Sequence, residues 1–115
     1  MAERAELFDL GRQQRLAEQI GQDRFDAMLG RLAERIETSL AEAGRLALSP
    51  SGLSELRAEA HAIAGLAANF GAVSLAAQAR ALEAACEAGD HAAVGDVLDA
   101  YLRTAKNTLS VLRDE

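Results

Sequence analysis

The chain has 115 residues, which is enough for one domain around a single core and too few for two. Half of the residues are hydrophobic, and alanine and leucine supply most of them, which favours helices over strands. The net charge of −6 and the absence of any run of Lys and Arg exclude a phosphate-binding surface for DNA or RNA, so nucleic acid is not an expected partner.

No segment of the sequence has the pattern of a targeting signal or a membrane span. No stretch approaches the roughly 18 uninterrupted apolar residues of a transmembrane helix, and no basic segment precedes an apolar run near the N-terminus. We therefore expect a soluble, cytoplasmic protein that has no contact with membranes. The single cysteine, Cys86, excludes an internal disulfide and a cysteine metal cluster, and its alanine-rich surroundings predict a buried side chain.

The apolar residues predict helices throughout the chain. They recur every three or four positions, and the strict alternation typical of strands is missing. A short helix is predicted over about residues 12–20, ending at Gly21. A long helix follows, with Asp23 as its N-cap and a seven-residue apolar pattern that continues from Phe25 to about Ala47.

Turn residues divide the rest of the chain into three further helices. Residues 49–52, which hold the only proline, interrupt the periodicity and suit the start of a new helix. That helix is predicted to end near residue 70, with Gly71 in the left-handed closing position. The next helix ends at Gly89, and Asp90 is a suitable cap for the last one, whose apolar stripe continues to Leu112.

Four long helices with one-sided apolar stripes and short loops predict one architecture. Short loops place successive helices antiparallel, and the stripes must face a common core. The predicted fold is all-α: an up-down antiparallel four-helix bundle with a short additional N-terminal helix, forming a single domain over residues 1–115.

His61 is the first candidate functional residue. With about 100° of rotation per residue, Leu56, Ile63 and Phe70 lie on one side of the third long helix and His61 lies about 160° from Ile63. Its side chain is therefore predicted to point into water. Unprotonated imidazole is abundant at neutral pH and can act as a nucleophile toward phosphorus.

The surroundings of His61 on the helix are unusually small. Apart from one arginine, its neighbours at three, four and seven positions are alanine or glycine: Arg57, Ala58, Ala64, Gly65 and Ala68. A glycine inside a helix costs about 1 kcal/mol relative to alanine, and one reason to tolerate it is the close approach of another surface. This pattern favours a nucleophile on a smooth docking surface; the alternative is an incidental surface histidine on an alanine-rich helix.

Residues 61–71, His-Ala-Ile-Ala-Gly-Leu-Ala-Ala-Asn-Phe-Gly, resemble the signature of histidine-containing phosphotransfer (HPt) domains. That signature has His, two residues, Lys and Gly, then small residues, an apolar residue and a second Gly. The similarity continues into the next helix and covers about residues 12–112; the further matching residues are Leu75, Ala79, Leu82 and Glu83.

The resemblance implies a role in a two-component phosphorelay. His61 is then phosphorylated on Nε2 and passes the phosphoryl group to or from an aspartate of a response-regulator receiver domain, with a histidine kinase as a further candidate partner. It implies a monomer without ATP-dependent kinase activity, without an intrinsic cofactor or metal site, and with Mg²⁺ supplied by the receiver. The implied docking surface consists of Arg57, Ala58, Ala64, Gly65, Ala68 and Asn69.

One departure from the signature leaves alternatives open. The signature lysine is Ala64 here; Arg57, one turn before His61, is either a replacement charge or an ordinary solvated side chain. The missing lysine suggests a second hypothesis, a non-phosphorylated binding module that sequesters a receiver domain or a histidine kinase. A third is a helical oligomerisation bundle. His91 is interpreted as a surface residue, and Glu83 either orients a group near the docking surface or is solvated or packed between helices.

Overall fold

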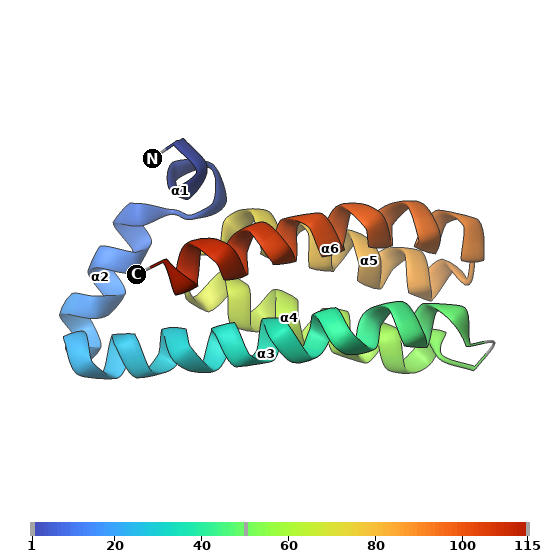
Figure 1. The fold of residues 1–115 in the computed structure, drawn as a ribbon, viewed down its shortest axis with the longest axis horizontal. Helices are drawn as coiled ribbons and strands as arrows, with labels where there is room; N and C mark the ends of the chain where they lie inside the picture. The colour runs from blue at the N-terminus through green and yellow to red at the C-terminus, as the bar shows by residue number, and fades with distance from the viewer. Residues whose placement is uncertain (1, 50, 115) are drawn as a thin grey trace.

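The computed structural model describes residues 2–49 and 51–114, and within these ranges it contains six α-helices and no strand (Figure 1). The predicted all-α class is therefore confirmed. The helices are α1 (Ala2–Leu7), α2 (Leu10–Ile20), α3 (Gln22–Leu48), α4 (Leu53–Asn69), α5 (Val73–Ala88) and α6 (His91–Arg113).

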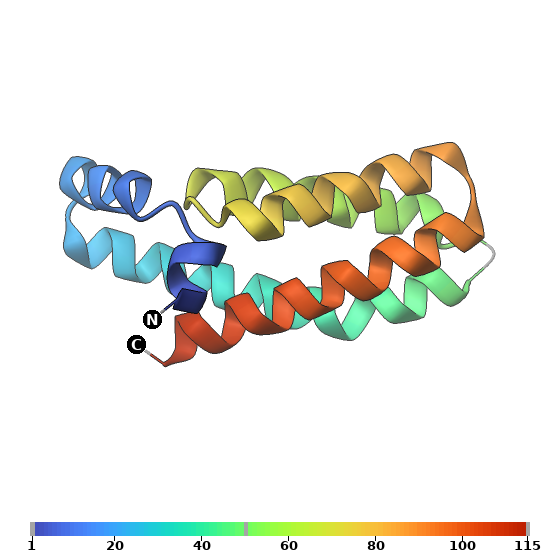
Figure 2. The ribbon, with the colours of Figure 1, turned by 90° about the horizontal axis from the view of Figure 1, so that it is seen from above.

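The N-terminal region differs most from the prediction. The expected short helix is present as α2, but it begins at Leu10, because the Asp9 side chain caps it by accepting a hydrogen bond from the Arg12 backbone N–H. A second short helix, α1, precedes it and packs against α5 and α6 (Figure 2). It was not predicted, since six residues are too few to show a helical period.

The helix ends confirm most of the expected turn residues. Gly71 and Gly89 both have φ of 70°, in the left-handed region that glycine adopts without strain. Asp90 caps α6 by accepting hydrogen bonds from two backbone N–H groups. The predicted N-cap Asp23 is wrong: the cap is Gly21, and Asp23 lies in the first turn of α3, where its charge favours the helix dipole. The predicted role of Pro50 lies outside the described residues.

Helices α3 to α6 pack lengthwise in a ring. Each contacts two others, α3 with α4 and α6, and α5 with α4 and α6; Figure 1 shows the chain direction alternating from one to the next. The most extensive pair is α4 with α5, where the buried residues on both helices include many alanines, which allow close approach. The large buried side chains include Leu32, Ile36, Leu56, Ile63, Phe70, Leu75, Leu82 and Tyr101.

One polar contact lies inside this core. The hydroxyls of Ser39 on α3 and Tyr101 on α6 form a hydrogen bond between two completely or almost completely buried side chains. Burial raises the pKa of Tyr101, so the phenol stays protonated and can donate. The bond links α3 to α6 through two residues that are 62 positions apart in the sequence.

We expect Ser39→Ala to lower the free energy of unfolding by about 1–3 kcal/mol, because it leaves the Tyr101 hydroxyl buried without a partner. Urea unfolding followed by circular dichroism measures the change. The double variant with Tyr101→Phe is expected to recover part of the loss, because both hydroxyls are then gone. A Ser39→Ala protein as stable as the wild type contradicts this view of the core.

Candidate functional site

His61 lies near the middle of α4, with its side chain 75% exposed. The helix is rotated so that Ala60, Ile63 and Ala67 face the core. His61 is consequently on the outer surface, and the exposure predicted from the helical wheel is confirmed.

The imidazole of His61 is held by a carboxylate on the neighbouring helix. Its Nδ1 lies 2.9 Å from Oε2 of Glu83 on α5, and the Glu83 side chain is only 20% exposed. Because an ionised carboxylate can only accept, the ring proton belongs on Nδ1. Nε2 then carries the lone pair, and it has no hydrogen-bond partner among residues 2–49 and 51–114. The contact selects the tautomer in which the lone pair on the unbonded Nε2 is available.

A second contact joins the same two helices one turn away. Arg57 of α4 pairs with Glu87 of α5, with 3.6 Å between Nη1 and Oε1. The two contacts show that α4 and α5 are antiparallel, because the later residue on α4, His61, contacts the earlier residue on α5, Glu83. The charge of Arg57 is therefore already partly balanced by a carboxylate.

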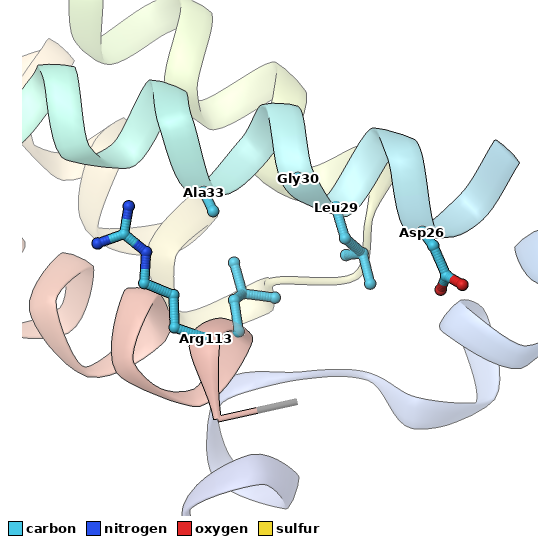
Figure 3. Close-up of a pocket in the computed structure, with 6 residues that line it drawn as sticks. Asp26, Leu29, Gly30, Ala33 and Arg113 are labelled. Atoms are coloured by element: carbon cyan, nitrogen blue, oxygen red, sulfur yellow. The ribbon is translucent and has the colours of Figure 1, made fainter. Parts of the chain in front are cut away.

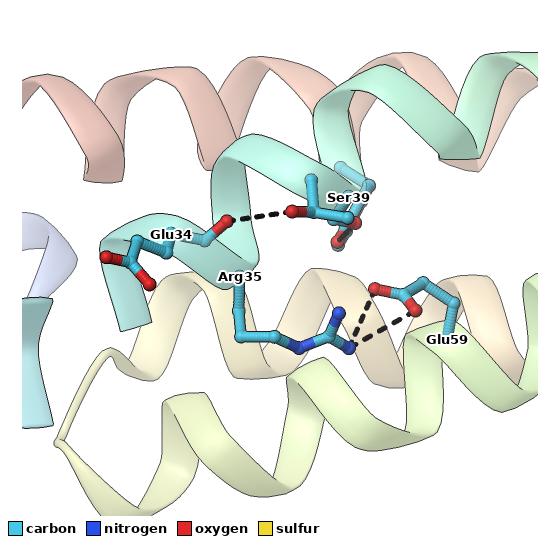
Figure 4. Close-up of polar contacts among 6 residues, drawn as sticks. Glu34, Arg35, Ser39 and Glu59 are labelled. Carbon is cyan, nitrogen blue, oxygen red and sulfur yellow. Dashed lines mark hydrogen bonds and ion pairs between the residues drawn. The ribbon is translucent and has the colours of Figure 1, made fainter. Parts of the chain in front are cut away.

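The opposite edge of α4 is fixed to α3. Arg35 donates two hydrogen bonds from Nη2 to the carboxylate of Glu59, at 3.0 and 3.2 Å, as Figure 4 shows. Glu59 lies about 160° around the helix from His61. Helix α4 is thus linked to α3 on one edge and to α5 on the other, which sets the direction in which His61 points.

Most residues of the predicted docking surface lie at the surface of the bundle. Ala58, Gly65 and Asn69 are exposed, Arg57 is exposed, and Ala68 is half-buried. Ala64 is only 4% exposed, so the expectation that it belongs to the exposed surface is wrong. It lies about 100° from Ile63 on the side of α4 that faces α5, at the seam between the two helices. We call the surface formed by Ala58, His61, Gly65, Ala68 and Asn69 the α4 platform.

Gly65 has no structural role that the fold itself explains. A Cβ atom added to it would meet no atom within 4 Å, so the bundle has room for a side chain there. The destabilising effect of glycine in a helix is therefore not offset by packing within the described parts of the chain. The open surface at Gly65 leaves room for another molecule to approach closely.

Helix α2 borders the C-terminal end of the α4 platform, which the sequence did not indicate. Nε of Arg12 donates to the backbone carbonyl of Ala68 at 3.0 Å, and a shallow pocket joins Arg12 and Arg15 to Asn69. Gln13 also donates to the carbonyl of Phe70. These are contacts from side chains to backbone atoms more than 50 positions away, and no residue pattern predicts them.

The other candidate residues have no visible role at this site. His91 is exposed at the first position of α6, and Cys86 is buried, which raises the pKa of its thiol. The described part of the chain contains no group of three or more His, Cys, Asp or Glu that could hold a metal ion. Within the same part, no helix is long and apolar enough to cross a membrane.

One hollow on the surface lies away from His61. It has a volume of about 380 Å³ and lies between α3 and α6, as Figure 3 shows; its lining residues are Asp26, Leu29, Gly30, Ala33, Leu112 and Arg113. None of these residues is a histidine, cysteine or serine that could act as a nucleophile.

Comparison with protein families identifies the family of the chain. The model of the Hpt domain family matches residues 27–115, which is more than half of the chain. The chain belongs to the Hpt domain family. The predicted resemblance is confirmed, and membership supports a histidine phosphotransfer role for this Hpt domain. Helices α1 and α2 lie outside the matched range.

A solved structure shows the same fold as this Hpt domain. It is described as that of a histidine-containing phosphotransfer protein from rice, has a TM-score of 0.76 and 15% sequence identity, and the match covers 92% of this chain and 79% of that chain. At this identity the likeness concerns the fold. No curated protein matches the sequence.

Proposed function

We propose that the chain is a phosphorelay intermediate, in which His61 accepts a phosphoryl group and exchanges it with an aspartate of a response-regulator receiver domain. The observation that carries this proposal is the exposed imidazole whose Nδ1 is bonded to Glu83, so that Nε2 is free to react. The proposed architecture is an up-down antiparallel four-helix bundle, which fixes the orientation of α4.

The transfer is a balanced exchange at phosphorus. The Nε2 lone pair of the neutral ring attacks the phosphoryl group of the receiver's phosphoaspartate, the Nε2–P bond forms, and the P–O bond to the aspartate breaks. The aspartate leaves as a carboxylate, and the ring becomes a cation that keeps its proton on Nδ1. Glu83, 2.9 Å from Nδ1, offsets that positive charge, and no proton has to be released. The reverse step follows the same path.

The protein itself supplies the nucleophile and the docking surface in this proposal. Mg²⁺ belongs to the acidic pocket of the receiver, where it neutralises charge on the transferred group. One helix of the receiver packs against the α4 platform, and the absence of a side chain at Gly65 allows the two helices to approach closely. In this role the chain works in the cytoplasm as a monomer, with receivers and a histidine kinase as partners and no ATP-dependent kinase activity of its own.

Incubation with phosphorylated receiver domains tests this proposal. The expected result is one phosphoryl group per chain, acid-labile and base-stable, located on His61 by mass spectrometry at alkaline pH. If no receiver labels the chain although receivers bind to it, the phosphorelay proposal fails. That outcome establishes the second candidate function, a binding module that sequesters a receiver or kinase, which the alanine at position 64 in place of the signature lysine favours.

Glu83 offers a test of the tautomer argument. We expect Glu83→Ala to slow phosphoryl transfer to His61 about tenfold, because the loss of one hydrogen bond to a charged group is worth about 1.4 kcal/mol. Rapid-quench measurement of transfer from a phosphorylated receiver gives the rate. Glu87→Ala, one turn along α5, is the matched control and should change the rate little. Equal rates for the two variants contradict the role assigned to Glu83.

A further inference from the structure

Phosphorylated His61 needs a cation that the sequence signature does not provide. In the proposed function on which this inference rests, the phosphoryl group brings about two negative charges to a ring already in contact with the Glu83 carboxylate. The lysine of the signature is replaced by Ala64, whose small side chain is buried at the seam between α4 and α5. A balancing charge supplied by this chain would therefore come from another residue.

Two nearby arginines are already engaged. Arg57 pairs with Glu87 on the side of His61 that faces away from Gly65. Arg12 donates to the carbonyl of Ala68, seven positions beyond His61, so its guanidinium is held about two turns along the helix. Neither side chain is free to reach His61 without giving up its present contact.

The register of the two helices places a third arginine opposite Ala64. The Arg57–Glu87 contact fixes one point of the antiparallel pair, and the His61–Glu83 contact confirms the direction. A step of seven residues along a helix covers almost two full turns, or about 10.5 Å. The side chain then points in nearly the same direction, about 20° away from the first. Moving seven residues from Glu87 leads to Arg80, and moving seven residues from Arg57 along α4 leads to Ala64.

Arg80 is exposed, and no carboxylate of the described residues lies within 4 Å of its guanidinium. The guanidinium presents five donors in a planar fork that matches phosphate oxygens. The surface at Gly65 next to Ala64 holds no atom within 4 Å of its missing Cβ, which leaves space for a long side chain to cross. We propose that Arg80, which lies on the adjacent helix α5, binds the phosphoryl group on Nε2 of His61. It thereby replaces the lysine that the signature places at position 64 of α4.

The binding stabilises the phosphorylated form without changing the bonds made and broken in the transfer. Phosphoryl oxygens accept hydrogen bonds from the guanidinium, and its positive charge favours the dianion over the monoanion. At an exposed site such a contact is worth about a two- to fivefold change in an equilibrium constant. The effect belongs to the phosphorylated chain alone, so it is measurable without a receiver.

The test uses chemically phosphorylated protein. Phosphoramidate transfers its phosphoryl group to Nε2, with the P–N bond of the reagent breaking and ammonia leaving, and the excess reagent is then removed. The pKa of the phosphoryl group is followed by ³¹P NMR in wild type, Arg80→Gln and Arg103→Gln. Arg103 is an exposed arginine on α6 without an ion pair in the described structure, so it controls for the change in net charge.

We expect Arg80→Gln to raise the pKa of the phosphoryl group and to reduce the equilibrium constant for transfer from a phosphorylated receiver about two- to fivefold. Arg103→Gln should match the wild type. Adding Ala64→Lys to Arg80→Gln should restore the wild-type values, because the new ammonium enters the same space from the other helix.

An unchanged ³¹P titration in Arg80→Gln overturns the inference. An unchanged titration also overturns the inference if the variant binds receivers more weakly, because Arg80 then contributes to docking alone. A chain that phosphoramidate labels but that no receiver labels refutes the proposed relay role, while the titration still decides the role of Arg80.

Discussion

Replacing His61 with glutamine is expected to reduce labelling from any phosphorylated receiver to background. Glutamine keeps a polar side chain of similar size but has no nitrogen lone pair that can attack phosphorus. The side chain is 75% exposed and makes one hydrogen bond, to Glu83, so the fold should be kept, with a change in stability within about 0.5 kcal/mol. Autoradiography of the labelled chain, together with a thermal melt, measures both quantities.

His91→Gln is the matched control for this experiment, because His91 is the only other histidine and is also exposed. It should be labelled like the wild type. Labelling of His61→Gln at the wild-type level would show that the phosphoryl acceptor is another residue. Loss of labelling in both variants would instead indicate that the substitutions affect docking rather than chemistry.

Gly65→Leu is expected to weaken receiver binding about 10- to 100-fold while leaving the bundle intact. The added side chain meets nothing within the described structure, and leucine favours helix over glycine, so stability should rise by roughly 0.5–1 kcal/mol. The same bulk on a surface that another helix approaches forces the two apart, and overpacking of this kind typically costs 1–3 kcal/mol. Isothermal titration with an unphosphorylated receiver gives the affinity.

The control places the same substitution elsewhere. Gly95 on α6 is also exposed and has open space around its missing Cβ, but α6 does not form the α4–α5 pair that carries His61. Gly95→Leu should bind the receiver like the wild type. If Gly65→Leu also binds normally, the α4 platform is not the docking surface, which favours the oligomerisation bundle with an incidental histidine.

The helices and the direction of His61 were predictable because both follow from local sequence. A period of 3.6 residues identifies α3 to α6, and glycine or aspartate marks several of their ends. The same wheel places His61 opposite Ile63 without knowledge of any other helix. The start of α3 was misplaced by two residues because Gly21 and Asp23 are both acceptable caps, and local sequence alone does not choose between them.

The contacts across helices were not predictable, because they depend on how one helix is shifted and rotated against another. The wheel of α4 suggested that Ala64 lay on the exposed face, but the position of α5 buries it. Glu83 was a candidate without a partner until the register placed it 2.9 Å from His61. The hydrogen bond from Arg12 to the carbonyl of Ala68 depends on the position of α2 beside the end of α4. Helix α2 lies outside the residues that the family model matches.

The attachment of α4 on both edges has a consequence for how the signal is carried. Arg35–Glu59 holds the helix to α3, and Arg57–Glu87 holds it to α5, independently of the state of His61. Neither pair involves the imidazole of His61, so the proposed phosphorylation would break neither of them. In the proposed relay, phosphorylation would add one covalent bond and its charge to a helix whose two attachments stay in place, so a receiver would meet nearly the same shape before and after transfer. Phosphoryl transfer to His61 and from His61 would then both proceed without a rearrangement of the bundle.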